Sequence, residues 1–219
     1  MADINLTSLP ISGHSGEAVP NRFFRQTGAV QDLAILFPGL NYTCDMPLLY
    51  YPARLLVERG ADVLQLRVDY TRPEFQSRER PEQVLWMGED ARAAAQAGMG
   101  QRNYDRLVLI GKSIGTFSLA YLVTQGGYSA ATTIWLTPLL RQPWLVQAAS
   151  QCRGPALFVA GTGDTTYDPA ALVRIREATG ARALILDGGN HSLEVPGELD
   201  RSIAWIGKYV QEIKSFLSF

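Results

Sequence analysis

The sequence predicts an α/β protein with a mostly parallel central sheet and helices on both of its faces. Short apolar runs rich in Val, Ile and Leu recur along the chain, and helical segments separate them. This alternation is typical of parallel strands joined by helical crossovers. The runs are also nearly continuous in apolar character, which indicates strands that are covered on both faces.

The N-terminal half begins with a mixed region and then becomes regular. Two short strands are expected at residues 4–11 and 18–24, around a turn at residues 12–16. The elements expected after them are a strand at Asp32–Phe37, a helix at residues 47–59 that Gly60 ends, a strand at residues 63–68, a polar loop at residues 69–81, and a helix that begins at Pro81 and ends near Ala97, before Gly98 and Gly100.

The C-terminal half continues the alternation. The strands expected in it are residues 107–110, Thr132–Leu136, 156–160 and 183–186, and the helices are residues 116–122, 143–150, Pro169–Thr179 and 198–216. About 19 residues separate Leu136 from Ala156, which leaves room for one short helix but not for a lid domain. We expect residues 1–219 to form a single domain, because no repeat, low-complexity tract or linker interrupts the pattern.

The composition and the net charge limit the kinds of molecule that the protein is expected to bind. Of the 219 residues, 47% are hydrophobic and 19% are charged, and the net charge is -1. These values are typical of a globular domain with a sizeable core, and they give no reason to expect binding to nucleic acid or to an anionic membrane. The sequence shows no signal peptide, no membrane-spanning stretch and only two cysteines, Cys44 and Cys152. A cytoplasmic protein without membrane insertion is the expectation.

The segment LVLIGKSIGTFSLAY, residues 107–121, carries the main chemical signal. An apolar strand runs into Gly-Lys-Ser-Ile-Gly and a helical segment follows at once, so Ser113 lies at a sharp strand-to-helix turn between two glycines. Such a turn holds the serine in a strained backbone conformation and exposes its hydroxyl at the end of the strand. It also leaves the Ile114 N–H without a partner inside the helix. This combination suits a nucleophile and the oxyanion that it creates.

The same residues allow an alternative interpretation as a nucleotide-binding site, because Gly-Lys-Ser also ends the phosphate-binding motif Gly-x-x-x-x-Gly-Lys-Ser. That loop requires glycine at position 106, where this chain has Arg106. Residues 107–110 also form an apolar strand rather than a flexible loop. Nucleotide binding is therefore not the favoured interpretation.

The chain offers one well-placed base for Ser113. A serine hydroxyl needs a neighbouring base to take its proton, and the two histidines are His14 and His191. His191 follows the strand at residues 183–186 in the loop Asp-Gly-Gly-Asn-His, whereas His14 lies in a turn with no strand end beside it. The carboxyl ends of parallel strands share one edge of the sheet, where functional side chains collect. We therefore expect His191 to reach Ser113.

Four carboxylates lie between the serine and this histidine along the chain: Asp164, Asp168, Glu177 and Asp187. Glu177 falls within a predicted helix, and Asp187 is too close to the histidine in sequence to approach the far side of its ring. Asp164 stands in the first turn after the strand at residues 156–160, and we expect it to orient the base and stabilise its charged form. Asp168 is the alternative, although it precedes a proline and is suited to cap the helix that begins there.

A second backbone donor for the oxyanion is expected in the loop after the strand at Asp32–Phe37. Leu40 is placed for this role, and Gly39 lets the backbone approach closely. The N–H groups of Leu40 and Ile114 are thus the predicted oxyanion donors, and such a donor is worth roughly 3–4 kcal/mol to a transition state.

The elbow Gly-Lys-Ser-Ile-Gly, the acid loop Gly-Thr-Gly-Asp and the base loop Gly-Gly-Asn-His together resemble the α/β-hydrolase superfamily over essentially the full length of the chain. Without a lid, the chain is similar to small esterases and dienelactone-hydrolase-like proteins. The resemblance implies a catalytic triad and two oxyanion donors: Ser113, Asp164 and His191, with Leu40 and Ile114.

Two motifs depart from the pattern of that superfamily. Pro38-Gly39 replaces the usual His-Gly before the oxyanion residue. The acid loop often runs on to Val-Pro, and here it reads Tyr167-Asp168-Pro169. The second departure keeps Asp168 open as an alternative acid.

Several residues near the predicted strand ends bear on the substrate. An apolar and aromatic rim suits a small or medium acyl group, and the residues expected to form it are Tyr42, Tyr70, Leu139, Trp144 and Tyr167. Lys112 beside the nucleophile could favour an anionic substrate, although a surface or structural charge is the preferred interpretation. Cys44 is interpreted as a packing residue.

The expected activity is hydrolysis of an ester or thioester through an acyl-enzyme on Ser113. His191 would take the serine proton, protonate the leaving group and then activate water. This chemistry requires no metal or cofactor, and its partner is a small-molecule ester. The alternatives are a non-catalytic binding protein of the same fold and an acyltransferase with the same triad. The presence of all three triad residues argues against a binding protein, which has no need of them.

Overall fold

The computed structural model describes residues 4–217 of the chain. At its centre is an eight-stranded sheet of order β1-β2-β4-β3-β5-β6-β7-β8. In chain order the strands are β1 (Ile4–Thr7), β2 (Asn21–Gln26), β3 (Asp32–Phe37), β4 (Asp62–Leu66), β5 (Arg106–Lys112), β6 (Thr132–Leu136), β7 (Ala156–Gly161) and β8 (Arg182–Leu186).

Helices connect most of these strands. They are α1 (Pro47–Glu58), α2 (Pro73–Gln76), α3 (Arg80–Met99), α4 (Gly115–Thr124), α5 (Pro143–Ala149), α6 (Pro169–Thr179) and α7 (Leu199–Phe216), with a short 3-10 helix, η1 (His14–Gly16), between β1 and β2. None of the helices within residues 4–217 has the length and apolar character needed to cross a membrane.

The sheet is mostly parallel, as predicted. Strands β4, β3, β5, β6, β7 and β8 pair in parallel in that spatial order, and β1 and β2 add an antiparallel edge beside β4. The carboxyl ends of β3, β5, β7 and β8 therefore open onto one edge of the sheet, which is the edge where the predicted functional residues lie.

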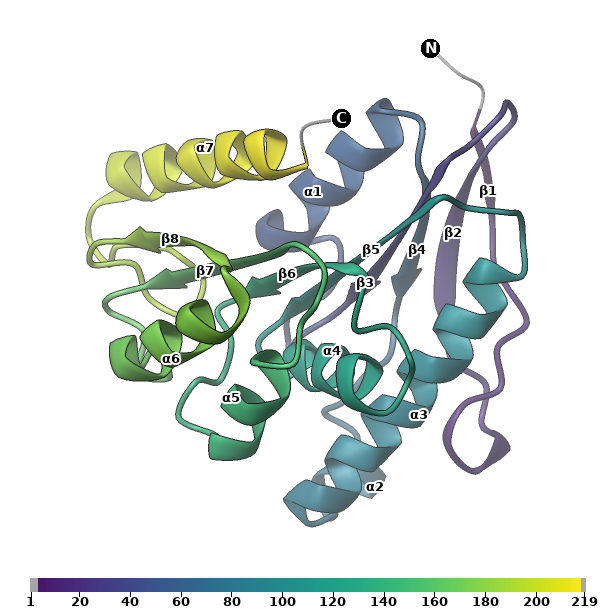
Figure 1. Ribbon diagram of the computed structural model, residues 1–219, viewed down its shortest axis with the longest axis horizontal. Coiled ribbons are helices and arrows are strands. Elements are labelled where there is room, and N and C mark those ends of the chain that lie inside the picture. The colour runs from purple at the N-terminus through teal and green to yellow at the C-terminus, as the bar shows by residue number, and fades with distance from the viewer. Residues whose placement is uncertain (1–3, 218–219) are drawn as a thin grey trace.

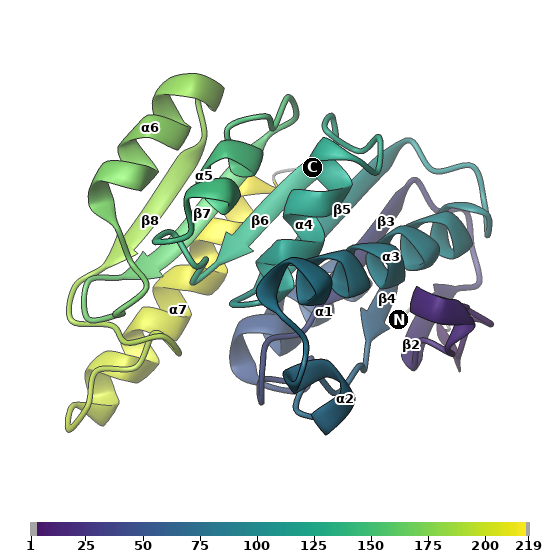
Figure 2. The ribbon, with the colours of Figure 1, turned by 90° about the horizontal axis from the view of Figure 1, so that it is seen from below.

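Helices cover both faces of the sheet (Figure 1), with α1 and α7 on one face and α3 to α6 on the other. Figure 2 shows the second group of helices in front of the strands. The side chains of β5 alternate between the faces: Val108 and Ile110 pack with α1 and α7, and Leu107 and Leu109 pack with α3 to α6. Because both faces are covered, the strands are apolar at successive positions, which is the pattern that predicted them.

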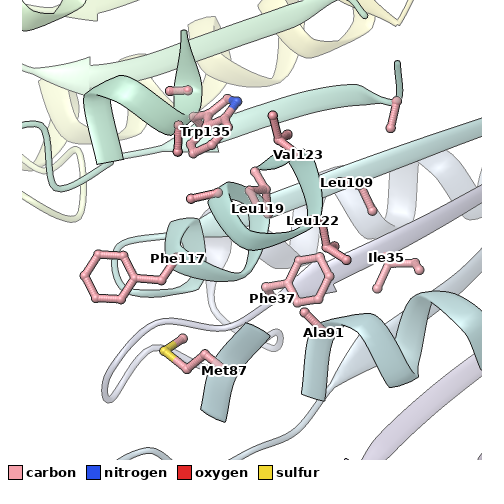
Figure 3. Packing of buried hydrophobic residues seen from close by; sticks show 14 of the residues in the cluster. Ile35, Phe37, Met87, Ala91, Leu109, Phe117, Leu119, Leu122, Val123 and Trp135 are labelled. Carbon is pink, nitrogen blue, oxygen red and sulfur yellow. The ribbon is translucent and has the colours of Figure 1, made fainter. Parts of the chain in front are cut away.

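Helix α4 is buried along all but its last residue. Figure 3 shows Leu119, Leu122 and Val123 of α4 among side chains of the sheet and of α3. Gly88 of α3 allows the two helices to approach, since a Cβ at this position would lie 2.2 Å from a ring carbon of Tyr121. Close packing on both sides therefore holds α4, and with it the turn from which it starts.

The polar segment at residues 69–81 is not a plain solvated loop. It contains the helical turn α2, which begins at Pro73 and buries Phe75. The Arg72 guanidinium lies over the Trp86 ring at 4.7 Å and pairs with Glu17 at 3.0 Å. The prediction of a loop was wrong here because a proline at the first helical position and a buried aromatic residue are enough to form a single turn.

Several boundaries also differ from the prediction. Helix α3 continues through Gly98 to Met99, because this glycine faces the sheet: a Cβ there would lie 3.0 Å from a side-chain methyl of Leu33. Gly98 therefore lets α3 pack closely on the sheet and does not end the helix. The N-terminal strands β1 and β2 cover residues 4–7 and 21–26, so β1 is shorter than expected and β2 begins and ends later.

Candidate active site

Ser113 occupies the turn between β5 and α4 in a left-handed backbone conformation, with a φ of 55°. Its N–H donates to the Leu136 carbonyl on β6 at 2.9 Å. Its carbonyl accepts from the backbone N–H of Thr116 at 3.0 Å and from the Thr116 hydroxyl at 2.5 Å. These bonds hold a conformation that costs an L-residue roughly 1–2 kcal/mol. The sharp, strained turn predicted around the serine is thus present.

The two flanking glycines allow three chain segments to meet at this turn. A Cβ on Gly111 would lie 2.6 Å from the Gly115 carbonyl oxygen, and a Cβ on Gly115 would lie 2.4 Å from the Phe37 carbonyl oxygen. Both separations are too short for any side chain. The end of β5, the start of α4 and the end of β3 can therefore touch only because these positions are glycine.

Ser113, His191 and Asp164 form one hydrogen-bonded chain. The Ser113 Oγ lies 2.7 Å from His191 Nε2, and His191 Nδ1 lies 2.7 Å from Asp164 Oδ2. An ionised carboxylate can only accept, so the Nδ1 proton points to Asp164 and Nε2 is left to accept from the serine hydroxyl. The sequence predicted these three residues together, and the structure brings them together.

Asp164 is almost fully buried, at 5% exposure. Burial raises its pKa, but hydrogen bonds from His191 and Thr166 outweigh burial and leave the pKa below its usual value. The N–H and the hydroxyl of Thr166 each donate to Asp164 Oδ1 at 2.8 Å. Thr166 was not among the predicted residues, although an Asp followed two residues later by Thr is a recognisable turn motif.

The loops that carry the acid and the base touch through their glycines. A Cβ on Gly161 would lie 1.9 Å from the Gly189 carbonyl oxygen, and Gly163 N–H donates to the same oxygen at 2.9 Å. In the second loop, the Asn190 side chain accepts from the backbone N–H of Ser192 at 2.8 Å. The contact between the two loops and this internal bond fix the position of His191 relative to Asp164.

The remaining candidates lie outside this chain of hydrogen bonds. Asp168 caps α6, because its Oδ1 accepts from Ala171 N–H at 3.0 Å. His14 lies in η1, pairs with Glu89 at 2.7 Å and stacks on Trp86. The geometry therefore favours Asp164 over Asp168 and His191 over His14.

The two predicted oxyanion donors have free N–H groups beside the serine. Within the described part of the chain, neither Leu40 N–H nor Ile114 N–H donates to another residue. Leu40 lies in the tight turn at residues 39–42, which Gly39 N–H closes by donating to the Tyr42 carbonyl at 2.9 Å. A Cβ on Gly39 would lie 3.2 Å from the carbonyl oxygen of Lys112, so this turn packs directly against the elbow.

Lys112 is not a surface charge. It is 2% exposed, and its ammonium nitrogen lies 4.4 Å from the centre of the Tyr42 ring. Burial lowers its pKa to about 8, although the nearby Asp164 carboxylate acts in the opposite direction. The prediction allowed a surface or a structural charge, and its surface alternative was wrong because Lys112 is the last residue of β5 and points to the same buried face as Val108 and Ile110.

Cys44 is a buried packing residue, as expected. It is 2% exposed, and its thiol donates to the Leu66 carbonyl at 3.3 Å. Burial raises the pKa of the thiol to about 12, so the nucleophilic thiolate is absent at neutral pH. Among residues 4–217 no three His, Cys, Asp or Glu side chains form a group that could hold a metal ion.

The five residues predicted to line a substrate pocket fall into two groups. Tyr42 and Tyr70 are buried and line a cavity of about 260 Å³ between the turn at residues 39–42 and the end of β4. The Tyr42 hydroxyl accepts from Leu48 N–H at 3.0 Å, which gives this residue a structural role.

The other three residues of that prediction are Leu139, Trp144 and Tyr167. They are partly buried against the core under α3 to α6, and Trp144 packs on Phe117 of α4 with ring centres 4.8 Å apart. Their place in a substrate pocket stays a prediction.

Known proteins share the fold that carries this geometry. No protein-family model matches the sequence, and no curated protein matches it. An esterase from Pyrococcus furiosus is similar in structure, with a TM-score of 0.68 and 11% identity over 99% of this chain and 90% of the esterase. An α/β serine hydrolase without a lid from Xanthomonas campestris is similar with a TM-score of 0.65 and 19% identity over 98% and 94% of the two chains.

A dienelactone hydrolase from Anabaena variabilis is also similar, with a TM-score of 0.66 and 16% identity over 95% of this chain and 96% of that protein. The chain has the α/β-hydrolase fold. Helix α5 alone connects β6 and β7, which agrees with the predicted form without a lid.

The strain at the elbow can be measured through its effect on stability. Ser113→Gly is expected to have a free energy of unfolding about 0.5–1 kcal/mol higher than Ser113→Ala, because glycine adopts a positive φ without steric cost. Urea unfolding followed by circular dichroism measures the difference. The matched pair is Ser118→Gly and Ser118→Ala inside α4, where glycine should be the less stable variant by about 1 kcal/mol. Equal stability of the two Ser113 variants would show that the turn is unstrained.

Proposed function

We propose that the protein is a serine hydrolase that cleaves a small or medium ester or thioester through an acyl-enzyme on Ser113. The observation that carries the proposal is the hydrogen-bonded chain from Ser113 through His191 to Asp164, which ends at a buried carboxylate. A base placed in this way activates a serine hydroxyl, and an acid behind it keeps the required tautomer. The esterase and the dienelactone hydrolase of the same fold support hydrolysis as the reaction class.

In the first half of the reaction, the Ser113 Oγ attacks the substrate carbonyl carbon while His191 Nε2 takes the hydroxyl proton. The tetrahedral oxyanion accepts from the N–H groups of Leu40 and Ile114, which have no acceptor within residues 4–217. Each such donor stabilises the transition state by roughly 3–4 kcal/mol. His191 then gives its proton to the leaving alcohol or thiol as the carbon–oxygen or carbon–sulfur bond breaks.

In the second half, water replaces the leaving group. His191 Nε2 takes a proton from the water as its oxygen attacks the acyl carbon, and the serine oxygen leaves with the proton that His191 returns. Asp164 stays ionised throughout, because hydrogen bonds hold its pKa below the usual value, and it stabilises the imidazolium formed in each half-reaction.

The substrate is proposed to be a small-molecule ester. The connection between β6 and β7 holds only α5, so no lid domain restricts access over Ser113 in the described chain. Leu139, Trp144 and Tyr167 offer partly buried apolar surface after β6 and β7, which suits a small or medium acyl group.

A fluorophosphonate probe tests the nucleophile directly. Ser113 is expected to attack the phosphorus with loss of fluoride, so the wild-type protein becomes labelled and Ser113→Ala does not. Hydrolysis of p-nitrophenyl acetate and butyrate should fall roughly 10⁴-fold or more in kcat in the same variant. Ser77→Ala, which replaces an exposed serine of the α2 segment, is the control and should keep both properties.

The outcomes of this experiment separate the alternatives. Absence of labelling in the wild type, or labelling that survives Ser113→Ala, would contradict the proposal and leave a binding protein as the better explanation. Labelling together with acyl transfer to an added alcohol, and without hydrolysis, would indicate an acyltransferase.

The acid can be identified by a matched pair of substitutions. Asp164→Asn is expected to lower kcat roughly 10⁴-fold, because an amide at this position favours the wrong tautomer of His191. Asp168→Asn should leave kcat unchanged, since asparagine caps a helix as well as aspartate does. Steady-state kinetics on the same ester measures both, and a large loss in Asp168→Asn alone would move the acid to that residue.

A further inference from the structure

Lys112 carries a buried charge that nothing in the reaction described above uses. Its side chain is 2% exposed, and within residues 4–217 its ammonium group forms no hydrogen bond and no ion pair. Removing a charge from water without a partner destabilises a protein. A lysine in this position is therefore expected to contribute something other than stability.

The contacts of Lys112 join the nucleophile elbow to the turn that carries Leu40. Its aliphatic stem lies under Gly39, where a Cβ would come within 3.1 Å of the lysine Cδ. Its ammonium nitrogen lies 4.4 Å from the centre of the Tyr42 ring, which is within the range of a cation–π interaction. Lys112 thus contacts the first and the last residue of the turn at residues 39–42, and the Leu40 N–H lies between them.

Tyr42 is itself held in place. Its hydroxyl accepts from Leu48 N–H at 3.0 Å, at the start of α1. Its carbonyl accepts from Gly39 N–H at 2.9 Å, which closes the turn. The Lys112 ammonium group on this ring therefore links the turn to the elbow. Lys112 is the residue immediately before Ser113, and the Ile114 N–H follows on the same stretch of backbone.

We propose that Lys112 is a positioning residue that holds the turn at residues 39–42 against the elbow, so that the N–H groups of Leu40 and Ile114 converge on one oxyanion. The inference rests on the proposed function, because it concerns the oxyanion that the proposed reaction forms. It assigns a role to a residue that binds no substrate and transfers no proton.

The charges around Lys112 predict how this role depends on pH. Burial lowers the pKa of Lys112 to about 8, and burial raises the pKa of Tyr42 to about 12. The other charged groups that face this pair are Asp164, after β7, which acts on Lys112, and Glu194, after β8, which acts on Tyr42. Hydrogen bonds keep the pKa of Asp164 low. The cation–π contact should therefore be lost as Lys112 loses its proton near pH 8, and kcat should fall on the alkaline side.

The same lowered pKa of Lys112 predicts that stability rises with pH, in the direction opposite to kcat. The pKa of Lys112 falls from 10.5 to about 8 on folding, so the folded protein is destabilised while the lysine is charged and this penalty disappears as pH rises from 8 toward 10.5. Replacing the lysine by an uncharged side chain of similar length should raise Tm at pH 7. A residue that served only in packing would show the reverse.

Lys112→Met tests the inference, and Lys214→Met, which replaces an exposed lysine of α7, is the matched control. At pH 7 we expect Lys112→Met to lower kcat roughly 10- to 100-fold with little change in KM, as a misplaced oxyanion donor should. The variant should also have a higher Tm and no alkaline fall in kcat near pH 8. Lys112→Arg keeps the charge, so it should recover part of kcat and move the alkaline fall to higher pH.

A titration without any substrate accompanies the kinetics. The chain has three lysines, Lys112, Lys208 and Lys214, so their ¹³Cε signals can be resolved and assigned with the two Met variants. One signal should titrate near pH 8 and be absent in Lys112→Met.

Three results would overturn the inference. One is unchanged kcat in Lys112→Met, and another is a fall of kcat together with a fall of Tm and no recovery in Lys112→Arg, which would indicate a packing role. The third is a Lys112 signal that titrates near the usual lysine pKa of about 10.4 and not near 8. A wild-type protein that neither reacts with the fluorophosphonate nor hydrolyses esters would instead refute the proposed function, and the inference with it.

Discussion

The close approach of three backbone segments around Ser113 is the constraint on which the rest of the site depends. The end of β5, the start of α4 and the end of β3 meet at distances that only Gly111 and Gly115 permit. This contact turns the serine into a left-handed conformation with a φ of 55°. It also brings the N–H of Ile114, which has no acceptor within residues 4–217, beside the turn that carries Leu40. Burial of α4 between the sheet and α3 holds the arrangement in place (Figure 3).

The site as a whole consists of groups that would be unfavourable elsewhere in a protein. It combines a left-handed serine and a buried carboxylate with backbone N–H groups and a buried lysine that have no hydrogen-bond or ion-pair partner among residues 4–217. Each of these is tolerated because the surrounding core is tightly packed on both faces of the sheet. Such a set of unfavourable features at one edge of a sheet is itself an indication of function, since strain and perturbed charges concentrate where chemistry takes place.

Much of this arrangement could be predicted from the sequence because the functional residues lie just after the ends of strands. Ser113, Asp164 and His191 each come directly after an apolar strand, and the carboxyl ends of parallel strands share one edge. Position along the chain is then enough to bring them together. Asp168 could be ranked behind Asp164 for a similar local reason, because an Asp before a proline is suited to cap a helix.

The features that could not be predicted depend on tertiary contacts. Gly98 looked like the end of a helix and instead faces Leu33, a contact that the local sequence does not contain. Tyr70 was predicted to lie on the rim of the pocket, but it is 2% exposed. Side-chain directions in a loop follow no regular alternation, so the sequence could not predict this burial. For Lys112 the prediction left a surface or a structural charge open because lysine is rarely buried, although its place in the alternation of β5 pointed to the buried face.

The central claim is that Ser113 attacks a carbonyl whose oxyanion lies between Leu40 and Ile114. A crystal structure of the protein after reaction with a small phosphonate, whose tetrahedral phosphorus imitates the intermediate, tests this claim most directly. We expect a bond from Ser113 Oγ to phosphorus and one phosphonyl oxygen about 2.7–3.1 Å from both backbone nitrogens. A phosphonate bound to another residue, or an adduct on Ser113 with no oxygen near Leu40 and Ile114, would contradict it.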